Sequence, residues 1–170
     1  MAINIPAIIA NHTLPPAVPP ELVMAIVVVE SNGNPWAMRA EPGYRWLWDI
    51  RRNCPWRGDA MDIPAPPFVS RATESWGQST SWGLMQVMGA TAREMGFRGP
   101  FLSELSDPHI GMEYGLKYLG TLVRRFYAAH GIEGVVAAYN AGSPRRSGGA
   151  WENQAYVDKV RRAGGFRACP

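Results

Sequence analysis

A single carboxylate ends a run of apolar residues near the start of the chain. Residues 22–29, LVMAIVVV, are all apolar, and Glu30 follows them directly. Burying a carboxylate without a partner is costly, and the usual response is a raised pKa that keeps the acid protonated near neutral pH. A proton held in this way is what general acid catalysis requires. The alternative is that Glu30 is the first exposed residue where an apolar segment reaches the surface.

A second group of residues suited to ligand binding is aromatic. Five of the seven tryptophans lie in one proline-rich region without a steady period: Trp36, Trp46, Trp48, Trp56 and Trp76. A long aromatic loop of this kind is usually functional, and tryptophan faces stack well on sugar rings. Trp46 and Trp48 are therefore candidate sugar-binding residues. Packing into a small aromatic core that holds the loop down is the alternative.

Composition argues against several other kinds of site. Cys54 and Cys169 are too few and too far apart for a zinc site, so we expect no metal and no cofactor. Two free thiols are expected, with a single disulfide as the alternative. The net charge of +3 comes almost wholly from arginine, since Lys117 and Lys159 are the two lysines. Mild, scattered basicity suits an anionic polymer but lacks a nucleic-acid recognition motif, so no nucleic-acid partner is expected.

The chain is long enough to bury a core in one domain. Its 170 residues are 46% hydrophobic and 18% charged, which is typical of a folded protein. No apolar run approaches the roughly 20 residues that span a bilayer, so no membrane insertion is expected. The N-terminus lacks a basic segment and a small-residue cleavage site, so we expect no signal peptide. We further expect a monomer.

Helix signals dominate the chain, and neither a repeat nor a strong hairpin pattern is present, so the predicted fold class is mainly α with at most a small β element. Pro20 and Glu21 suit a helix start, although the Ile/Val run that follows also suits a strand, and local rules leave that choice open. Asp107 and Pro108 predict a helix N-terminus, and Gly131 a helix end. Helices are predicted at residues 3–11, 90–95, 109–130, 132–139 and 152–163.

Four short motifs occur in a recognisable order. They are Glu30-Ser31 with Asn34-Pro35-Trp36-Ala37, then SWGLMQV at 81–87, AYNAG at 138–142, and Tyr156-Val157. Together they resemble the catalytic domain of soluble lytic transglycosylases, a lysozyme-like family of the glycoside hydrolase family twenty-three type that includes phage-borne members. The resemblance covers residues 21–160. It implies one lysozyme-like α-helical domain over residues 1–170, with a long Trp/Pro-rich irregular insert at about 39–80, and a helix ending at Glu30.

The resemblance also implies a reaction. In the family one glutamate, here Glu30, protonates the glycosidic oxygen between N-acetylmuramic acid (MurNAc) and N-acetylglucosamine (GlcNAc) in peptidoglycan. It then takes the proton of the muramic acid C6 hydroxyl, which closes a 1,6-anhydro ring. One carboxylate suffices because the substrate supplies its own nucleophile, a departure from the two-carboxylate rule. The alternatives are a peptidoglycan or chitin hydrolase of the same fold and a wall-binding module without turnover.

Further residues are expected to bind the glycan strand because they match family motifs. These are Ser81, Gln86, Met88, Tyr139, Asn140 and Glu152. For Asn140 a purely structural capping role is the alternative. For Glu152 the match is looser, and an acid at a helix N-terminus is the alternative.

Two features depart from the family pattern. The insert is longer than the short Ser-Pro-x-Gly-Ala link of most members, and its Glu41-Pro42-Gly43-Tyr44 segment resembles phage-type relatives. Its acids could supply a second carboxylate to a water-using lysozyme: Glu41, Asp49, Asp59, Asp62 and Glu74. The second departure is Gly89, where proline is common. We expect synthesis in the host cytoplasm and action on the cell wall, after holin-type release as an endolysin or as a virion component.

Overall fold

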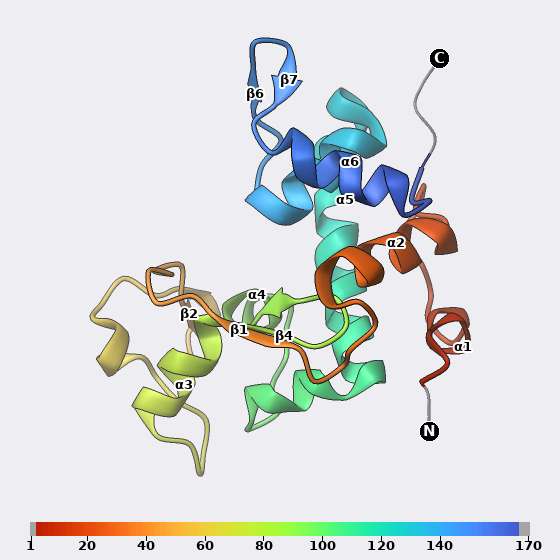
Figure 1. Ribbon diagram of the computed structural model, residues 1–170. Coiled ribbons are helices and arrows are strands. Elements are labelled where there is room, and N and C mark those ends of the chain that lie inside the picture. Colours follow the sequence, from red (N-terminus) through yellow and green to blue (C-terminus); the bar gives the residue numbers. More distant parts are fainter. Residues whose placement is uncertain (1–2, 167–170) are drawn as a thin grey trace. The chain divides into compact units, whose positions relative to one another are not determined.

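The computed structural model describes residues 3–166 and divides into two compact units (Figure 1). The terminal unit combines Met1–Gly33 with Leu116–Pro170, and the middle unit is Asn34–Gly115. That the whole chain acts as a single domain stays a prediction. Cys54 is half-buried, whereas Cys169 lies outside the described residues, as does any pairing between the two.

Helices make up most of the regular structure, which confirms the mainly α fold class. The α-helices are α1 (Ile5–Ala10), α2 (Pro20–Ser31), α3 (Arg71–Gln78), α4 (Gly89–Glu94), α5 (Pro108–Ala141) and α6 (Gln154–Arg162). Two 3-10 helices are η1 (Ala60–Asp62) and η2 (Leu102–Ser106). Within residues 3–166, no helix combines the length and the apolar character that crossing a membrane requires.

The strands are two or three residues long and form three small antiparallel sheets. They are β1 (Met38–Ala40), β2 (Trp48–Asp49), β3 (Cys54–Pro55), β4 (Thr80–Trp82), β5 (Val87–Met88), β6 (Arg146–Ser147) and β7 (Ala150–Trp151). The first sheet has the order β1-β4-β5, while β2 pairs with β3 and β6 with β7. The sequence showed no strong hairpin pattern because strands this short carry too few residues to display alternation.

The apolar run before Glu30 is a helix, as the family resemblance implied. Pro20 is the first residue of α2 and Glu21 lies in its first turn, where fixed φ and negative charge both favour a helix start. Burial against the rest of the terminal unit overrides the strand propensity of the Ile and Val residues. The helix ends where Asn32 adopts the left-handed conformation (φ 51°).

The long helix α5 begins and bends where the sequence predicts. The Asp107 carboxylate accepts hydrogen bonds from the backbone N–H groups of His109 (2.9 Å) and Ile110 (3.1 Å), and Pro108 is the first helical residue. Gly131 has non-helical angles (φ 61°, ψ −167°) and divides α5 into the two predicted segments. Glycine adopts this positive φ without a Cβ clash.

The insert contains a helix that the sequence did not predict. The Ser70 side chain caps α3 by accepting a hydrogen bond from the Thr73 N–H (3.0 Å). The inward face of α3 carries Glu74 and Gln78, which are polar, so no apolar period marked this helix. Polar groups at these buried positions require partners, and the helix therefore depends on a hydrogen-bond network.

That network is centred on a buried ion pair. The Arg93 guanidinium in α4 donates from Nε and Nη2 to the two oxygens of Glu74, both at 2.8 Å, and neither side chain is more than 1% exposed. Gln78 donates to Glu74 (2.8 Å) and to the Trp48 carbonyl (3.0 Å), and accepts from the Trp48 N–H (2.7 Å). The network thereby ties β2, α3 and α4 of the middle unit together.

Gly89 allows α3 and α4 to approach closely. A Cβ on this residue would overlap the carbonyl oxygen of Gly77 and lie 2.9 Å from the Gln78 Cα. Backbone atoms cannot rotate away as a side chain can. The glycine at this position therefore serves packing in the middle unit.

We expect Gly89→Ala to destabilise the protein by about 1–3 kcal/mol, because the added methyl forces two helices apart. Thermal unfolding followed by circular dichroism measures the change, which amounts to several degrees in Tm. Gly43→Ala is the matched control, since its Cβ would meet no heavy atom within 4 Å. Equal melting temperatures for the two variants would contradict the packing role of Gly89.

Candidate active site

Glu30 lies on the buried face of α2. It follows Ile26 by four residues and Val27 by three, so the three side chains share one side of the helix. Ile26 and Val27 are fully buried, and Glu30 itself is half-buried. The apolar run therefore delivers the carboxylate to a partly dehydrated position, instead of ending at an exposed residue.

A tyrosine from the other end of the chain holds this carboxylate. The Tyr156 hydroxyl in α6 donates a 2.6 Å hydrogen bond to Glu30 Oε1 across a separation of 126 residues. The pKa of Tyr156 is raised far above its usual value, first by burial and then by the charge of Glu30 and this hydrogen bond. Tyr156 therefore keeps its proton near neutral pH and remains a hydrogen-bond donor.

A second tyrosine, Tyr139, feels the charge of the same carboxylate, and Tyr118 packs against Tyr139. Burial, followed by the charge of Glu30, raises the pKa of Tyr139 well above its usual value, and Tyr118 adds to the shift. The Tyr118 and Tyr139 rings are 5.4 Å apart and tilted by 49°. Tyr139 was predicted from the sequence as a substrate-binding residue, and the structure places it in the electrostatic environment of Glu30.

The predicted sugar-binding residue Asn140 contacts the start of α6. Its side-chain oxygen accepts a hydrogen bond from Asn153 Nδ2 (3.0 Å), which also donates to the Ala137 carbonyl (3.0 Å). Asn140 is exposed near the end of α5. The contact gives it a structural role, and sugar binding stays a prediction.

Glu152 follows a two-stranded hairpin. Gly148 and Gly149, both with positive φ, form the turn between β6 and β7. The Glu152 N–H donates to the Arg145 carbonyl (2.9 Å), and its carboxylate pairs with Arg145 Nε (3.1 Å). Glu152 thus precedes α6 without belonging to its first turn, and its side chain is half exposed.

Ser81, Gln86 and Met88 come together in the middle unit. Ser81 in β4 faces Met88 in β5, and the Ser81 hydroxyl donates to Gln86 Oε1 (2.9 Å). Gln86 Nε2 donates to the carbonyls of Ala37 and Gly83, both at 2.9 Å. Gln86 therefore fixes the turn between the strands, and Met88 is half-buried beside it.

The two predicted stacking tryptophans differ in their surroundings. Trp46 is 75% exposed, as a sugar platform requires. Trp48 is half-buried in β2, and its buried Nε1 has no hydrogen-bond partner among residues 3–166. Its position in the network around Gln78 indicates a core residue.

Comparison with protein-family models matches residues 66–159, more than half of the chain, to the transglycosylase SLT domain. The chain belongs to this family. No curated protein and no solved structure matched the chain. The SLT match includes Ser81, Gln86, Tyr139 and Tyr156, and it begins after Glu30. Family membership establishes a lysozyme-like lytic transglycosylase that acts on peptidoglycan.

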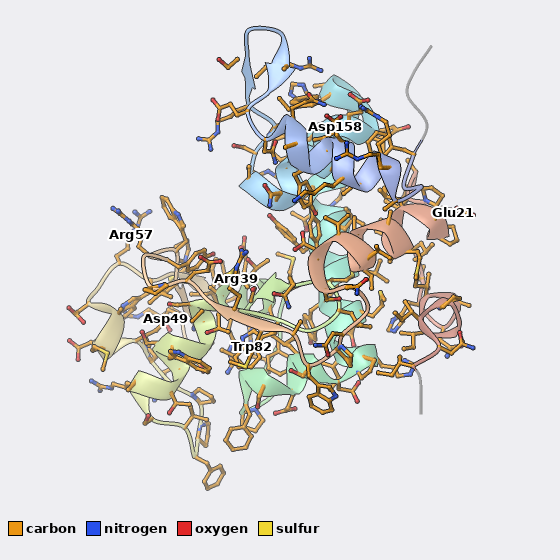
Figure 2. The ribbon with its side chains drawn as sticks, viewed as in Figure 1. Glu21, Arg39, Asp49, Arg57, Trp82 and Asp158 are labelled. Atoms are coloured by element: carbon orange, nitrogen blue, oxygen red, sulfur yellow. The ribbon has the colours of Figure 1, made fainter. Side chains whose placement is uncertain are left out.

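The five insert acids that could have supplied a second carboxylate to this SLT domain all have partners in the middle unit. Glu41 pairs with Arg39 (2.6 Å) and Asp62 with Arg71 (3.2 Å). Asp49, 2% exposed, accepts from the N–H groups of the next turn, and Figure 2 shows it within the insert. Asp59 caps η1. Glu74 is held by the buried arginine.

Sequence reasoning missed the partner of Glu30 in this SLT domain. Tyr156 was part of a quoted motif but was given no role. No local pattern links residue 156 to residue 30, because their contact arises from the packing of α2 on α6. Helical spacing could have indicated Tyr156, because it lies one turn before Val160, on the buried face of α6.

The raised pKa of Tyr156 gives a pH dependence of stability. The unfolded chain releases this proton near pH 10, whereas the folded SLT domain retains it, so its contribution is complete below pH 10 and falls above it. We expect Tyr156→Phe to lessen the decline in unfolding free energy above pH 10, by an amount that approaches about 1.4 kcal/mol per pH unit above about pH 11.

Urea unfolding at several pH values measures this decline. Tyr127→Phe is the matched control, because Tyr127 is exposed on α5. A decline in Tyr156→Phe as steep as that of the unchanged protein would contradict the assignment.

Proposed function

We propose that this protein cleaves the MurNAc-β-1,4-GlcNAc bond of peptidoglycan and leaves 1,6-anhydro-MurNAc ends, with Glu30 as the single catalytic acid and base. The observation that carries the proposal is the 2.6 Å hydrogen bond between Tyr156 and Glu30. It gives a half-buried carboxylate a neutral partner, which leaves the carboxylate able to accept and release a proton. Family membership supplies the substrate.

The reaction has two proton transfers at one carboxyl group. Protonated Glu30 gives its proton to the glycosidic oxygen as the C1–O bond breaks, and the GlcNAc hydroxyl leaves. The Glu30 carboxylate then removes the proton of the MurNAc C6 hydroxyl while O6 bonds to C1. The acid is restored in its starting form. Because O6 belongs to the same sugar as C1, proximity supplies much of the acceleration.

Tyr156 orients Glu30 in both steps. Its hydroxyl occupies one side of Oε1 and restricts rotation of the carboxyl group. The same hydrogen bond can be kept after the first transfer, when Glu30 is a carboxylate, because the hydroxyl is the donor. We propose Tyr139 as a neighbour that binds sugar and limits access of water to the same carboxyl group, since it is 8% exposed.

The contacts of the insert acids support a reaction with one catalytic carboxylate. A water-using enzyme needs a second one to activate its nucleophile. The most buried candidate, Glu74, forms a bidentate ion pair with Arg93, and removing it would leave a buried cation unpaired. The two buried acids of the insert, Asp49 and Glu74, are therefore already engaged in structure and do not supply the second carboxylate that a hydrolase would need.

We further propose that the glycan strand contacts the residues predicted from the family motifs. In the terminal unit these are Tyr139, Asn140 and Glu152. In the middle unit they are Ser81, Gln86, Met88 and Trp46, with Ser81 and Gln86 acting mainly through the turn that they hold. The segment Glu41-Pro42-Gly43-Tyr44 resembles phage-type relatives. This resemblance supports a role in cell-wall lysis, as a phage endolysin or a virion-associated enzyme.

We expect Glu30→Gln to lower the rate of peptidoglycan solubilisation by at least about two orders of magnitude, since an amide cannot donate the required proton. Glu21→Gln is the matched control: it changes an acid on the same helix that lies in the exposed first turn. Mass spectrometry of the products from the unchanged protein should give anhydro ends. Reducing ends that contain oxygen-18 from the solvent would instead identify a hydrolase, and full activity of Glu30→Gln would identify another catalytic group.

The two tryptophans should respond differently to truncation. We expect Trp46→Ala to weaken binding to glycan strands by about 1 kcal/mol without lowering Tm, because an exposed ring is lost from a sugar platform. Trp48→Ala should lower Tm, because it removes a packed ring from β2. Isothermal titration with glycan strands and thermal unfolding separate the two effects. Unchanged glycan affinity in Trp46→Ala would remove this residue from the binding surface.

A further inference from the structure

The insert encloses a pocket that the reaction at Glu30 does not use. Its volume is about 530 Å³, and its lining belongs to the middle unit. Three arginines contribute the charge of this arginine pocket: Arg51, Arg71 and Arg98. The other lining residues are small or apolar: Ile50, Ala65, Pro66, Pro67 and Val69. No acidic side chain lines the pocket, so it offers an anion both charge and apolar contact.

Arg98 is fixed before any ligand binds. Its Nη1 donates to the carbonyls of Arg93 (2.9 Å) and Phe97 (3.1 Å), and its Nη2 donates to Asn53 Oδ1 (2.8 Å). Asn53 lies in the turn between β2 and β3 and has a positive φ of 53°. A guanidinium held in place loses little conformational entropy on binding an anion, which favours affinity.

The other two arginines retain capacity for an anion. Arg71 pairs with Asp62 at 3.2 Å, but both side chains are about two-thirds exposed, so the pair contributes little. The Arg51 side chain forms no ion pair within residues 3–166. Its neighbour Asp49 accepts the backbone N–H groups of Arg51 (2.9 Å) and Arg52 (3.1 Å) on Oδ1. Three arginines line the pocket and one of them, Arg71, pairs with an acid, so positive charge predominates there.

These properties suit a short peptide with a free carboxylate. Guanidinium groups bind carboxylates through paired hydrogen bonds, and pockets of this size hold small ligands. Alanine and proline side chains leave room for small apolar groups such as the alanine methyls of peptidoglycan stem peptides. We propose that the arginine pocket binds a carboxylate of the stem peptide, so that the insert recognises the substrate through its peptide. The assignment of the ligand to peptidoglycan rests on the proposed function.

Binding of a defined peptide tests the pocket without any turnover. The probe is the tripeptide L-Ala-γ-D-Glu-L-Lys, and its matched ligand control has both carboxylates converted to carboxamides. We expect the acid form to bind and Arg51→Gln to weaken it about tenfold, as for loss of one charge-assisted hydrogen bond. Arg57→Gln is the protein control, because Arg57 is exposed and does not line the pocket, and Figure 2 shows it at the outer edge of the insert.

Several outcomes would overturn the proposal. Equal affinity for the acid and the amide peptide would exclude carboxylate recognition. An equal loss of peptide affinity in Arg51→Gln and Arg57→Gln would show that only the overall charge of the protein matters. Complete displacement of the peptide by an equal concentration of inorganic phosphate would show a general anion site. The Arg51 side chain is exposed and forms no ion pair within residues 3–166, so its variant is expected to fold even where Arg98→Gln does not.

Turnover separates this proposal from the catalytic one. We expect Arg51→Gln to raise KM about tenfold on peptidoglycan that carries stem peptides and to leave KM unchanged on glycan strands stripped of peptide. Equal KM changes on both substrates would contradict peptide recognition. Absence of anhydro products from the unchanged protein would refute the reaction and leave the peptide-binding result to decide the pocket.

Discussion

The hydrogen bond from Tyr156 to Glu30 is the interaction on which the terminal unit depends. It joins α2 to α6 across 126 residues and satisfies the one carboxylate that the apolar run carries inward. A half-buried acid without a donor would destabilise the helix packing that brings the two ends of the chain together. Because burial raises the pKa of Tyr156, the donor keeps its proton near neutral pH.

The middle unit also buries a carboxylate, and there its partner is an arginine. Glu74 is buried against a guanidinium, and Arg93 donates to both of its oxygens. This bidentate ion pair between two buried side chains serves structure. At Glu30 the partner is instead a neutral tyrosine hydroxyl, which donates one hydrogen bond. The chemistry of the partner, more than burial itself, thus distinguishes a structural acid from a candidate catalytic one.

Local signals predicted much of the fold. Asp107, Pro108 and Gly131 marked the start and the bend of α5 because caps and glycine conformations depend on a few neighbouring residues. Local signals did not predict α3, because its buried face is polar and shows no apolar period. They also did not predict the site, since neither the Tyr156 contact nor the commitment of the Gln86 amide to backbone carbonyls follows from local sequence. Long-range pairing of polar groups determines both.

In the proposed reaction, Tyr156 acts through Glu30. A double-mutant cycle on the rate of anhydro product formation measures this coupling. Tyr156→Phe should slow the unchanged protein about tenfold, equivalent to about 1.4 kcal/mol, and should have almost no further effect in the Glu30→Gln background. The same fractional loss in both backgrounds would show that the two residues act independently and would contradict this coupling.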